Sequence, residues 1–128
     1  MEEVGAVTGS AERPELDVLT EEDYEKAKVD LPKPLLLQLG SAACERCPAF
    51  HDAIAALKET HQFKWVYCDA HHQDADLPEF FSVARLPAFV LYNPGTEQPL
   101  VVANASPEQL HDAVSKTCTP VFTLDADF

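Results

Sequence analysis

The chain has 128 residues, of which 22 are acidic and nine are basic, and it carries a formal net charge of −13 at pH 7. Hydrophobic residues make up 46% of the chain, which is enough apolar side-chain volume for one folded domain. A net charge of this sign repels phosphate backbones and anionic membrane surfaces. It therefore argues against nucleic acid and membrane as ligands and favours a basic protein partner.

The two ends of the chain differ in composition from the rest. Residues 1–14 mix Gly, Ser and Glu with no helical or strand period, which predicts a flexible leader, and residues 119–128 form an acidic tail. The folded domain is expected over residues 15–118. The leader lacks the basic and apolar regions of a signal peptide, and no apolar run is long enough to cross a bilayer, so the sequence predicts a cytoplasmic protein.

The first half of the domain predicts two strands and two helices in alternation. The segment Thr20-Glu21-Glu22-Asp23 resembles a capping box, which starts a helix. A short apolar run after Pro34 predicts a buried strand, an amphipathic segment predicts the next helix, and an aromatic and β-branched run predicts the second strand. A helix between two strands predicts a right-handed crossover with parallel pairing. The expected ranges are 20–29, 35–39, a helix from near Cys44 to Thr60, and 63–68.

The second half predicts a short helix, a strand hairpin and a closing helix. The turn signal Asn93-Pro94-Gly95-Thr96 separates the two hairpin strands, which are expected to be antiparallel. Ser106 followed by Pro107 predicts the start of the last helix, since serine caps a helix and proline fits its first turn. The expected ranges are 78–81, 88–92, 100–103 and 107–117.

Three features placed on this order of elements resemble the thioredoxin-like family. Cys44-Glu45-Arg46-Cys47 stands between the first parallel strand and its helix, Leu86-Pro87 precedes an antiparallel strand, and Asp69 closes the second parallel strand. The resemblance covers residues 35–117. It implies an α/β thioredoxin fold with a central mixed sheet of about four to five strands flanked by about four helices.

The cysteine pair predicts thiol–disulfide chemistry. A helix N-terminus favours a thiolate, so Cys44 is expected to be the nucleophile, and two intervening residues allow Cys47 to act as the resolving thiol. Arg46 and His51 are expected to favour the Cys44 thiolate and Glu45 to oppose it. No cofactor and no metal are expected for this reaction.

The resemblance also assigns roles outside the motif. It implies that the Leu86–Pro87 peptide bond is cis and that these two residues bind substrate beside the dithiol. The family's buried aspartate falls on Gln38, which cannot take a proton. Resolution by Cys47 would then depend on water, on His51 or on another base, which predicts slower turnover than in a typical thioredoxin.

Other interpretations of the cysteines remain open at this point. One alternative is a structural remnant in a non-catalytic module. Another is a zinc or iron–sulfur site that the pair forms with His71 and His72, which follow the second strand. Cys68 lies within a strand, where a cysteine usually acts as a small hydrophobic residue, while Cys118 lies just past the last helix.

Two functional hypotheses follow from the sequence. The first is a thiol–disulfide oxidoreductase that reduces or exchanges protein disulfides and draws electrons from a separate reductase or a small thiol. The second is a thioredoxin-fold binding or assembly module that acts through protein contacts alone. Dependence of catalysis on Cys44 distinguishes the two.

Overall fold

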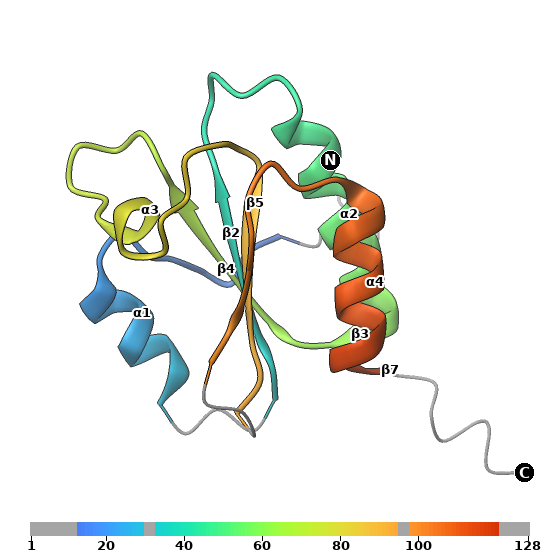
Figure 1. The fold of residues 1–128 in the computed structure, drawn as a ribbon. Coiled ribbons are helices and arrows are strands. Elements are labelled where there is room, and N and C mark those ends of the chain that lie inside the picture. The colour runs from blue at the N-terminus through green and yellow to red at the C-terminus, as the bar shows by residue number, and fades with distance from the viewer. Residues whose placement is uncertain (1–12, 30–32, 95–97, 121–128) are drawn as a thin grey trace, which may run out of the picture.

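The computed structural model describes residues 13–29, 33–94 and 98–120. Most of the predicted leader, the acidic tail from residue 121 onward and the second half of the predicted turn at 93–96 lie outside the described residues. The described part contains a five-stranded sheet in the order β1-β4-β2-β5-β6 (Figure 1). The strands are β1 (Leu16–Asp17), β2 (Leu35–Gly40), β4 (Lys64–Asp69), β5 (Ala88–Tyr92) and β6 (Leu100–Val102).

Strand β2 forms the centre of the sheet, and all six of its residues are buried. It pairs in parallel with β4 and antiparallel with β5, with Leu37 opposite Val66 on one side and Val90 on the other. A strand paired on both edges and covered on both faces needs a nearly continuous apolar run, which β2 has apart from Gln38. The predicted strands, the parallel pairing of β2 with β4 and the antiparallel hairpin are confirmed. β4 lies one residue later than predicted at both ends, β2 ends one residue later and β6 ends one residue earlier.

Helices cover both faces of this sheet. Figure 1 shows α1 (Glu21–Lys28) and α3 (Leu77–Phe80) on one face and α2 (Cys47–Thr60) and α4 (Pro107–Thr117) on the other. Each face has its own apolar core: Trp65 and Phe50 lie in the core under α2 and α4, whereas Val66 lies in the core beside α1. Neighbouring residues of one strand thus face opposite cores.

The ends of α1 and α4 follow the sequence signals. Thr20 caps α1 by accepting a hydrogen bond from the Asp23 backbone N–H, and the Asp23 carboxylate accepts one from the Thr20 N–H in return. The same reciprocal pair joins Ser106 and Gln109 at the start of α4. Each pair satisfies backbone N–H groups that have no partner inside the helix.

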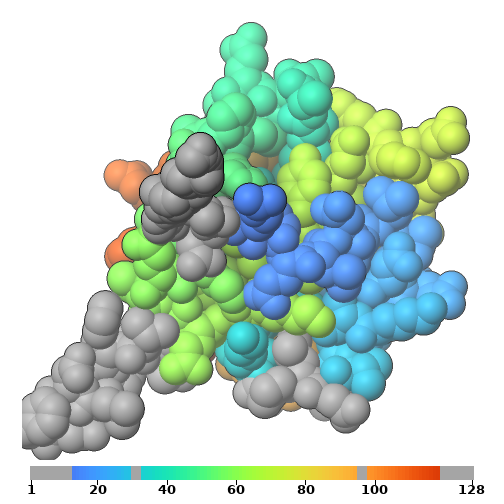
Figure 2. Space-filling model, turned by 180° about the vertical axis from the view of Figure 1, so that it is seen from behind, coloured from blue at the N-terminus to red at the C-terminus, as the bar shows by residue number. Residues whose placement is uncertain are grey.

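Three two-residue strands were not predicted. β1 pairs in parallel with the outer edge of β4, and Figure 2 shows this N-terminal segment, in dark blue, exposed on the molecular surface. β3 (His61–Gln62) pairs antiparallel with β7 (Thr119–Pro120). Strand β7 thus lies within residues 119–128, for which the sequence predicted only an acidic tail. In the described ranges, no helix is long and apolar enough to span a membrane.

Candidate active site

The cysteine pair lies between the end of β2 and the start of α2. Cys44 and Cys47 form a disulfide, with their Cα atoms 5.4 Å apart. The helix begins at Cys47, not near Cys44 as predicted. Residues 41–46 instead form turns, because the Ser41 carbonyl accepts from the Cys44 N–H and the Ser41 hydroxyl accepts from the Ala43 N–H. Cys44 therefore precedes the helix, and its sulfur is bonded to the first helical residue.

The two sulfurs differ in exposure, since Cys44 is half-buried and Cys47 is only 6% exposed. Cys44 lines two cavities. One, of about 450 Å³, also contains Glu45, Arg46, His71 and Leu86 among its lining residues. The other, of about 420 Å³, contains Cys44 together with Cys47, and the remaining residues that line it are Pro14, Gln38, Ser41, Ala42, Pro48, His51, Tyr67 and Asp69.

The segment before β5 borders the first cavity. The Leu86–Pro87 peptide bond is cis, and Leu86 lines the cavity next to Cys44. Pro87 is buried, and its carbonyl accepts a hydrogen bond of 2.8 Å from the Ala105 N–H. Leu86 is thus the residue of this pair that lines the space in front of the disulfide, while Pro87 anchors the segment to the loop after β6.

Arg46 connects the disulfide turn to that same loop. Its guanidinium donates to the Asn104 side-chain oxygen at 2.7 Å and to the Ala105 carbonyl at 2.8 Å. Asn104 has a positive φ of 52°, a conformation that asparagine tolerates better than most residues. The cation is therefore held by two oxygens, which competes with the expected stabilisation of a Cys44 thiolate. Glu45 is exposed beside it.

Gln38 lies buried under the cavity that contains both sulfurs, with 1% of its surface exposed. Its side-chain oxygen accepts a hydrogen bond of 3.0 Å from the Trp65 indole N–H. The His51 ring packs against the same indole, with ring centroids 4.9 Å apart. The position therefore holds a neutral, hydrogen-bonded pair and no buried acid.

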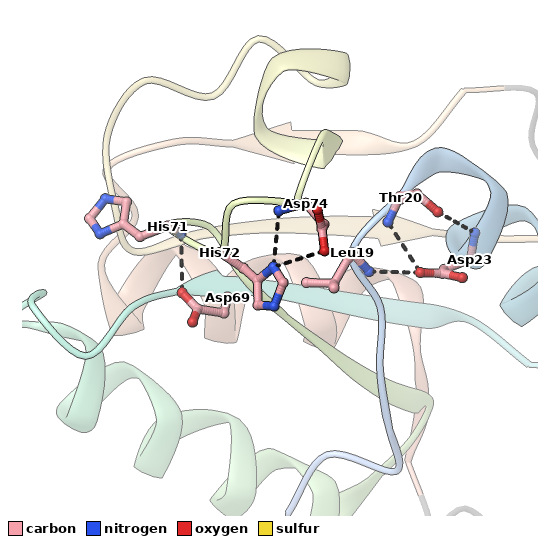
Figure 3. Close-up of polar contacts among 7 residues, drawn as sticks. All are labelled: Leu19, Thr20, Asp23, Asp69, His71, His72 and Asp74. Atoms are coloured by element: carbon pink, nitrogen blue, oxygen red, sulfur yellow. Dashed lines mark hydrogen bonds and ion pairs between the residues drawn. The ribbon is translucent and has the colours of Figure 1, made fainter.

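Asp69 and the two histidines after β4 point to different partners. The Asp69 carboxylate accepts from the His71 backbone N–H at 3.1 Å, and the His72 ring accepts from the Asp74 N–H at 3.0 Å. In Figure 3 the rings of His71 and His72 point in different directions. Over the described ranges, no three His, Cys, Asp or Glu side chains lie close enough together to hold a metal ion.

Comparison with known proteins gives matches in structure alone. No family model matches the sequence, and no curated protein matches it. Mitochondrial thioredoxin 3 from Saccharomyces cerevisiae has a TM-score of 0.69, 16% identity and coverage of 85% of this chain and 99% of its own. Thioredoxin from Schistosoma mansoni has a TM-score of 0.68, 17% identity and coverage of 80% and 96%. A mutant thioredoxin from Halobacterium salinarum has a TM-score of 0.67, 19% identity and coverage of 81% of this chain and 90% of its own.

The chain has the thioredoxin fold. The resemblance inferred from the cysteine motif, the Leu86-Pro87 dipeptide and the order of elements is confirmed at the level of the fold. All three identities lie below 20%, so the activity has to follow from the residues of the site itself.

Within this thioredoxin fold, sequence analysis missed two residues at the dithiol, Gly40 and Tyr67. A Cβ atom added to Gly40 would lie 3.3 Å from the Cys47 sulfur and 3.4 Å from the Tyr67 hydroxyl oxygen. Strand alternation could have predicted Tyr67, because residues two apart on a strand share a face and Trp65 of β4 lies beside the buried Gln38. Burial, with the negative charge of Asp69 nearby, raises the pKa of Tyr67.

The other two cysteines are free thiols inside the fold. Cys68 is fully buried in β4, and burial, with the charge of Asp69 as a smaller cause, raises its pKa to about 12. Burial raises the pKa of Cys118 to about 11, although Lys58 acts in the opposite direction. Cys68 thus behaves as the small hydrophobic residue that the sequence predicted, and Cys118 resembles it.

Proposed function

We propose that this protein is a thiol–disulfide oxidoreductase that reduces or exchanges protein disulfides through Cys44 and Cys47. The observation that carries the proposal is the asymmetric disulfide: Cys44 lines two cavities, whereas Cys47 is 6% exposed. Such a pair offers one sulfur to an incoming partner and keeps the second close enough to close the ring. A purely structural disulfide needs no cavity in front of it.

The reaction proceeds in two exchange steps that balance in atoms and electrons. In the reduced protein the Cys44 thiolate attacks one sulfur of a substrate disulfide, and the other substrate sulfur leaves as a thiolate. The Cys47 thiolate then attacks the Cys44 sulfur and releases the second substrate sulfur. Two electrons pass to the substrate, and the Cys44–Cys47 bond forms. A separate reductase or a small thiol returns the two electrons.

Neighbouring residues tune these steps. Leu86 and Pro87 would hold a substrate segment against the front of the disulfide. Arg46, fixed by two hydrogen bonds, would set the shape of the turn more than the charge at Cys44. Because Gln38 cannot accept a proton, the proton of Cys47 would pass to water or to His51, which lines the same cavity.

The charge of the chain shapes the choice of partner. With 22 acidic and nine basic residues, the protein attracts disulfide-containing partners that have basic surfaces, and no nucleic acid or membrane surface is expected as a ligand. A dithiol of this kind works where thiols are kept reduced, so we place the protein in the cytoplasm. We retain the division into a leader, a thioredoxin-fold domain and an acidic tail as part of this proposal.

Reduction of insulin disulfides by a thiol reductant tests the proposal. Wild-type protein should accelerate the reaction, Cys44→Ser should abolish the acceleration, and Cys118→Ala, which removes a buried thiol, should leave it intact. If the folded wild type gives no acceleration over the reductant alone, the binding module becomes the leading hypothesis. The neutral Gln38–Trp65 pair, where a proton acceptor is expected, is the observation that favours this second function.

A further inference from the structure

The thioredoxin-like family has a buried aspartate under the second cysteine, and in this chain Gln38 takes that position. Gln38 is neutral, and its oxygen is already bonded to the Trp65 indole. An attacking or departing Cys47 must nevertheless exist as a thiolate during exchange. A buried thiolate without a hydrogen-bond donor is strongly disfavoured, so a donor has to come from another residue that reaches this sulfur.

The Tyr67 hydroxyl and the Cys47 sulfur both approach Gly40 in β2. Gly40 has no side chain, and the missing Cβ position lies 3.3 Å from the Cys47 sulfur and 3.4 Å from the Tyr67 hydroxyl oxygen. The sulfur and the hydroxyl oxygen therefore both border the same methyl-sized space. Tyr67 and Cys47 also line the same cavity, so the phenol has room to turn toward the sulfur.

The phenol is suited to donate and not to lose its proton. Burial and the charge of Asp69 raise the pKa of Tyr67, so the hydroxyl stays protonated where cysteines ionise. A protonated hydroxyl that faces a thiolate forms a charge-assisted hydrogen bond, which is stronger than one between neutral groups. A phenol that stays protonated stabilises negative charge on a nearby sulfur without taking part in proton transfer.

We propose that the Tyr67 hydroxyl donates a hydrogen bond to the Cys47 sulfur once the Cys44–Cys47 bond is reduced, and so stabilises the Cys47 thiolate. This inference rests on the proposed exchange reaction. When an external thiolate attacks Cys44, the Cys44–Cys47 bond breaks and its electron pair leaves on Cys47, where Tyr67 receives it with a hydrogen bond. In the reverse direction the same bond favours Cys47 as the attacking thiolate.

Other charged groups also face the cysteine pair. His51 on α2 and Asp69 on β4 line the cavity that Cys47 shares with Tyr67, and Asp69 opposes a thiolate while a protonated His51 favours it. Glu45, Arg46 and His71 line the other cavity, beside Cys44. A test of Tyr67 must therefore leave all five in place and remove the hydroxyl alone.

The decisive measurement is the pKa of Cys47 in a Cys44→Ser background, followed by the ultraviolet absorbance of the thiolate. A Cys44→Ser, Cys47→Ser double variant supplies the baseline, and Cys68 and Cys118 stay silent because their pKa values are about 12 and about 11. Adding Tyr67→Phe keeps the ring and its packing. Its expected effect is a rise of about one unit in the Cys47 pKa, since hydrogen bonds to charged groups contribute roughly this much.

Two further variants guard the interpretation. Tyr92→Phe removes a phenol at the opposite end of the sheet, where Tyr92 pairs with Leu35, and should leave the Cys47 pKa unchanged. Gly40→Ala adds a methyl group 3.3 Å from the sulfur and 3.4 Å from the hydroxyl oxygen, which crowds their approach, and should raise the Cys47 pKa in the same direction as Tyr67→Phe. An unchanged Cys47 pKa in folded Tyr67→Phe protein would overturn the inference.

The inference and the proposed function can fail separately. The Cys47 pKa is measured without any substrate, whereas insulin reduction reports turnover. Wild-type turnover with an unshifted Cys47 pKa in Tyr67→Phe rejects the role of the phenol and keeps the oxidoreductase. A shifted Cys47 pKa without wild-type turnover keeps the hydrogen bond and rejects the oxidoreductase.

Discussion

The four cysteines of this chain lie in two different environments. Cys44 and Cys47 are bonded at the end of β2, where Cys44 lines two cavities. Cys68 and Cys118 are free thiols buried in the apolar cores on opposite faces of the sheet, with their pKa values raised to about 12 and about 11. The residue type is the same, so position in the fold decides which thiols exchange and which only pack.

Two neighbouring residues of β4 show that a shift of one position along a strand changes the environment of a side chain. Tyr67 faces α2 and the dithiol cavity, whereas Cys68, the next residue, faces the core beside α1. Alternation along a strand separates the two by the full thickness of the sheet. A shift of one residue in the pairing of β4 would place the thiol at the cavity and the phenol in the core.

The largest expected difference between the two environments is in turnover. Cys47→Ser should reduce disulfide turnover to background and accumulate a mixed disulfide between Cys44 and the substrate, because the attack that releases the product is lost. Non-reducing electrophoresis with a disulfide-bonded substrate detects the adduct. Trapping of substrate on Cys68 or Cys118 would contradict the contrast drawn between the two environments.

Native alkylation should separate the same two environments. In reduced protein at about pH 8, iodoacetamide should label Cys44 faster than Cys68 by about a thousandfold and faster than Cys118 by about a hundredfold. These ratios follow from the thiolate fractions of a cysteine with the ordinary pKa of about 8.5 and of thiols with pKa values of about 12 and about 11. Peptide mass spectrometry of timed samples gives the rates. Equal labelling in folded protein would show that the core opens on the labelling timescale, and unfolded protein serves as the reference for complete labelling.

Much of the fold that separates the two cysteine environments was predictable from local patterns. Local sequence patterns predicted the main elements: the apolar runs predicted β2 and β5, and Ser106-Pro107 predicted the start of α4. The cysteine motif predicted the position of the site. β1, β3 and β7 each have two residues, and their pairing partners lie far along the chain, so no local pattern predicts them.

The details of the site depend on contacts between distant segments. The Arg46 contacts with Asn104 and Ala105 join residues almost 60 positions apart, and no periodicity encodes them. The late start of α2 depends on hydrogen bonds to Ser41, which compete with a further helical turn. The position of Tyr67 near the Cys47 sulfur depends on the pairing of β4 with β2 and on the missing side chain of Gly40, which strand alternation alone does not specify.

A buried acid introduced at Gln38 tests whether the residue under the dithiol cavity is as closed to water as the two apolar cores. Gln38→Glu keeps an acceptor for Trp65, but burial should raise the pKa of the new carboxyl above its unfolded value of about 4.3. The folded state then holds a proton that the unfolded state releases, so the destabilisation should appear above about pH 4.3 and grow with pH to about 1–3 kcal/mol. Denaturant unfolding across pH measures it.

The matched control for that variant is Gln62→Glu, since Gln62 is exposed on β3. It should show no comparable growth of destabilisation with pH. Equal pH profiles for the two variants would mean that the Gln38 site is wet, contrary to its 1% exposure.

The smallest expected effect lies far from the dithiol, at the start of α1. Thr20→Ala removes the hydroxyl that accepts from the Asp23 N–H and should lower the free energy of unfolding by about 1 kcal/mol without changing disulfide turnover. Loss of turnover in folded Thr20→Ala protein would contradict the separation of packing from reactivity.

The Asp23 carboxylate at the same cap makes stability depend on pH. Backbone hydrogen bonds from Leu19 and Thr20 lower the pKa of Asp23 (Figure 3). The contribution of Asp23 to stability is therefore present above its unfolded pKa and is lost as pH falls through the lower folded value.

The most direct test of the central claim is a redox titration of the Cys44–Cys47 pair in thiol–disulfide buffers, with the oxidised fraction read by alkylation and mass. An exchanging pair should show one two-electron transition between about −300 and −120 mV, with Cys68 and Cys118 unmodified throughout. A pair that stays fully oxidised below about −300 mV would be a structural disulfide. That result would contradict the proposed oxidoreductase.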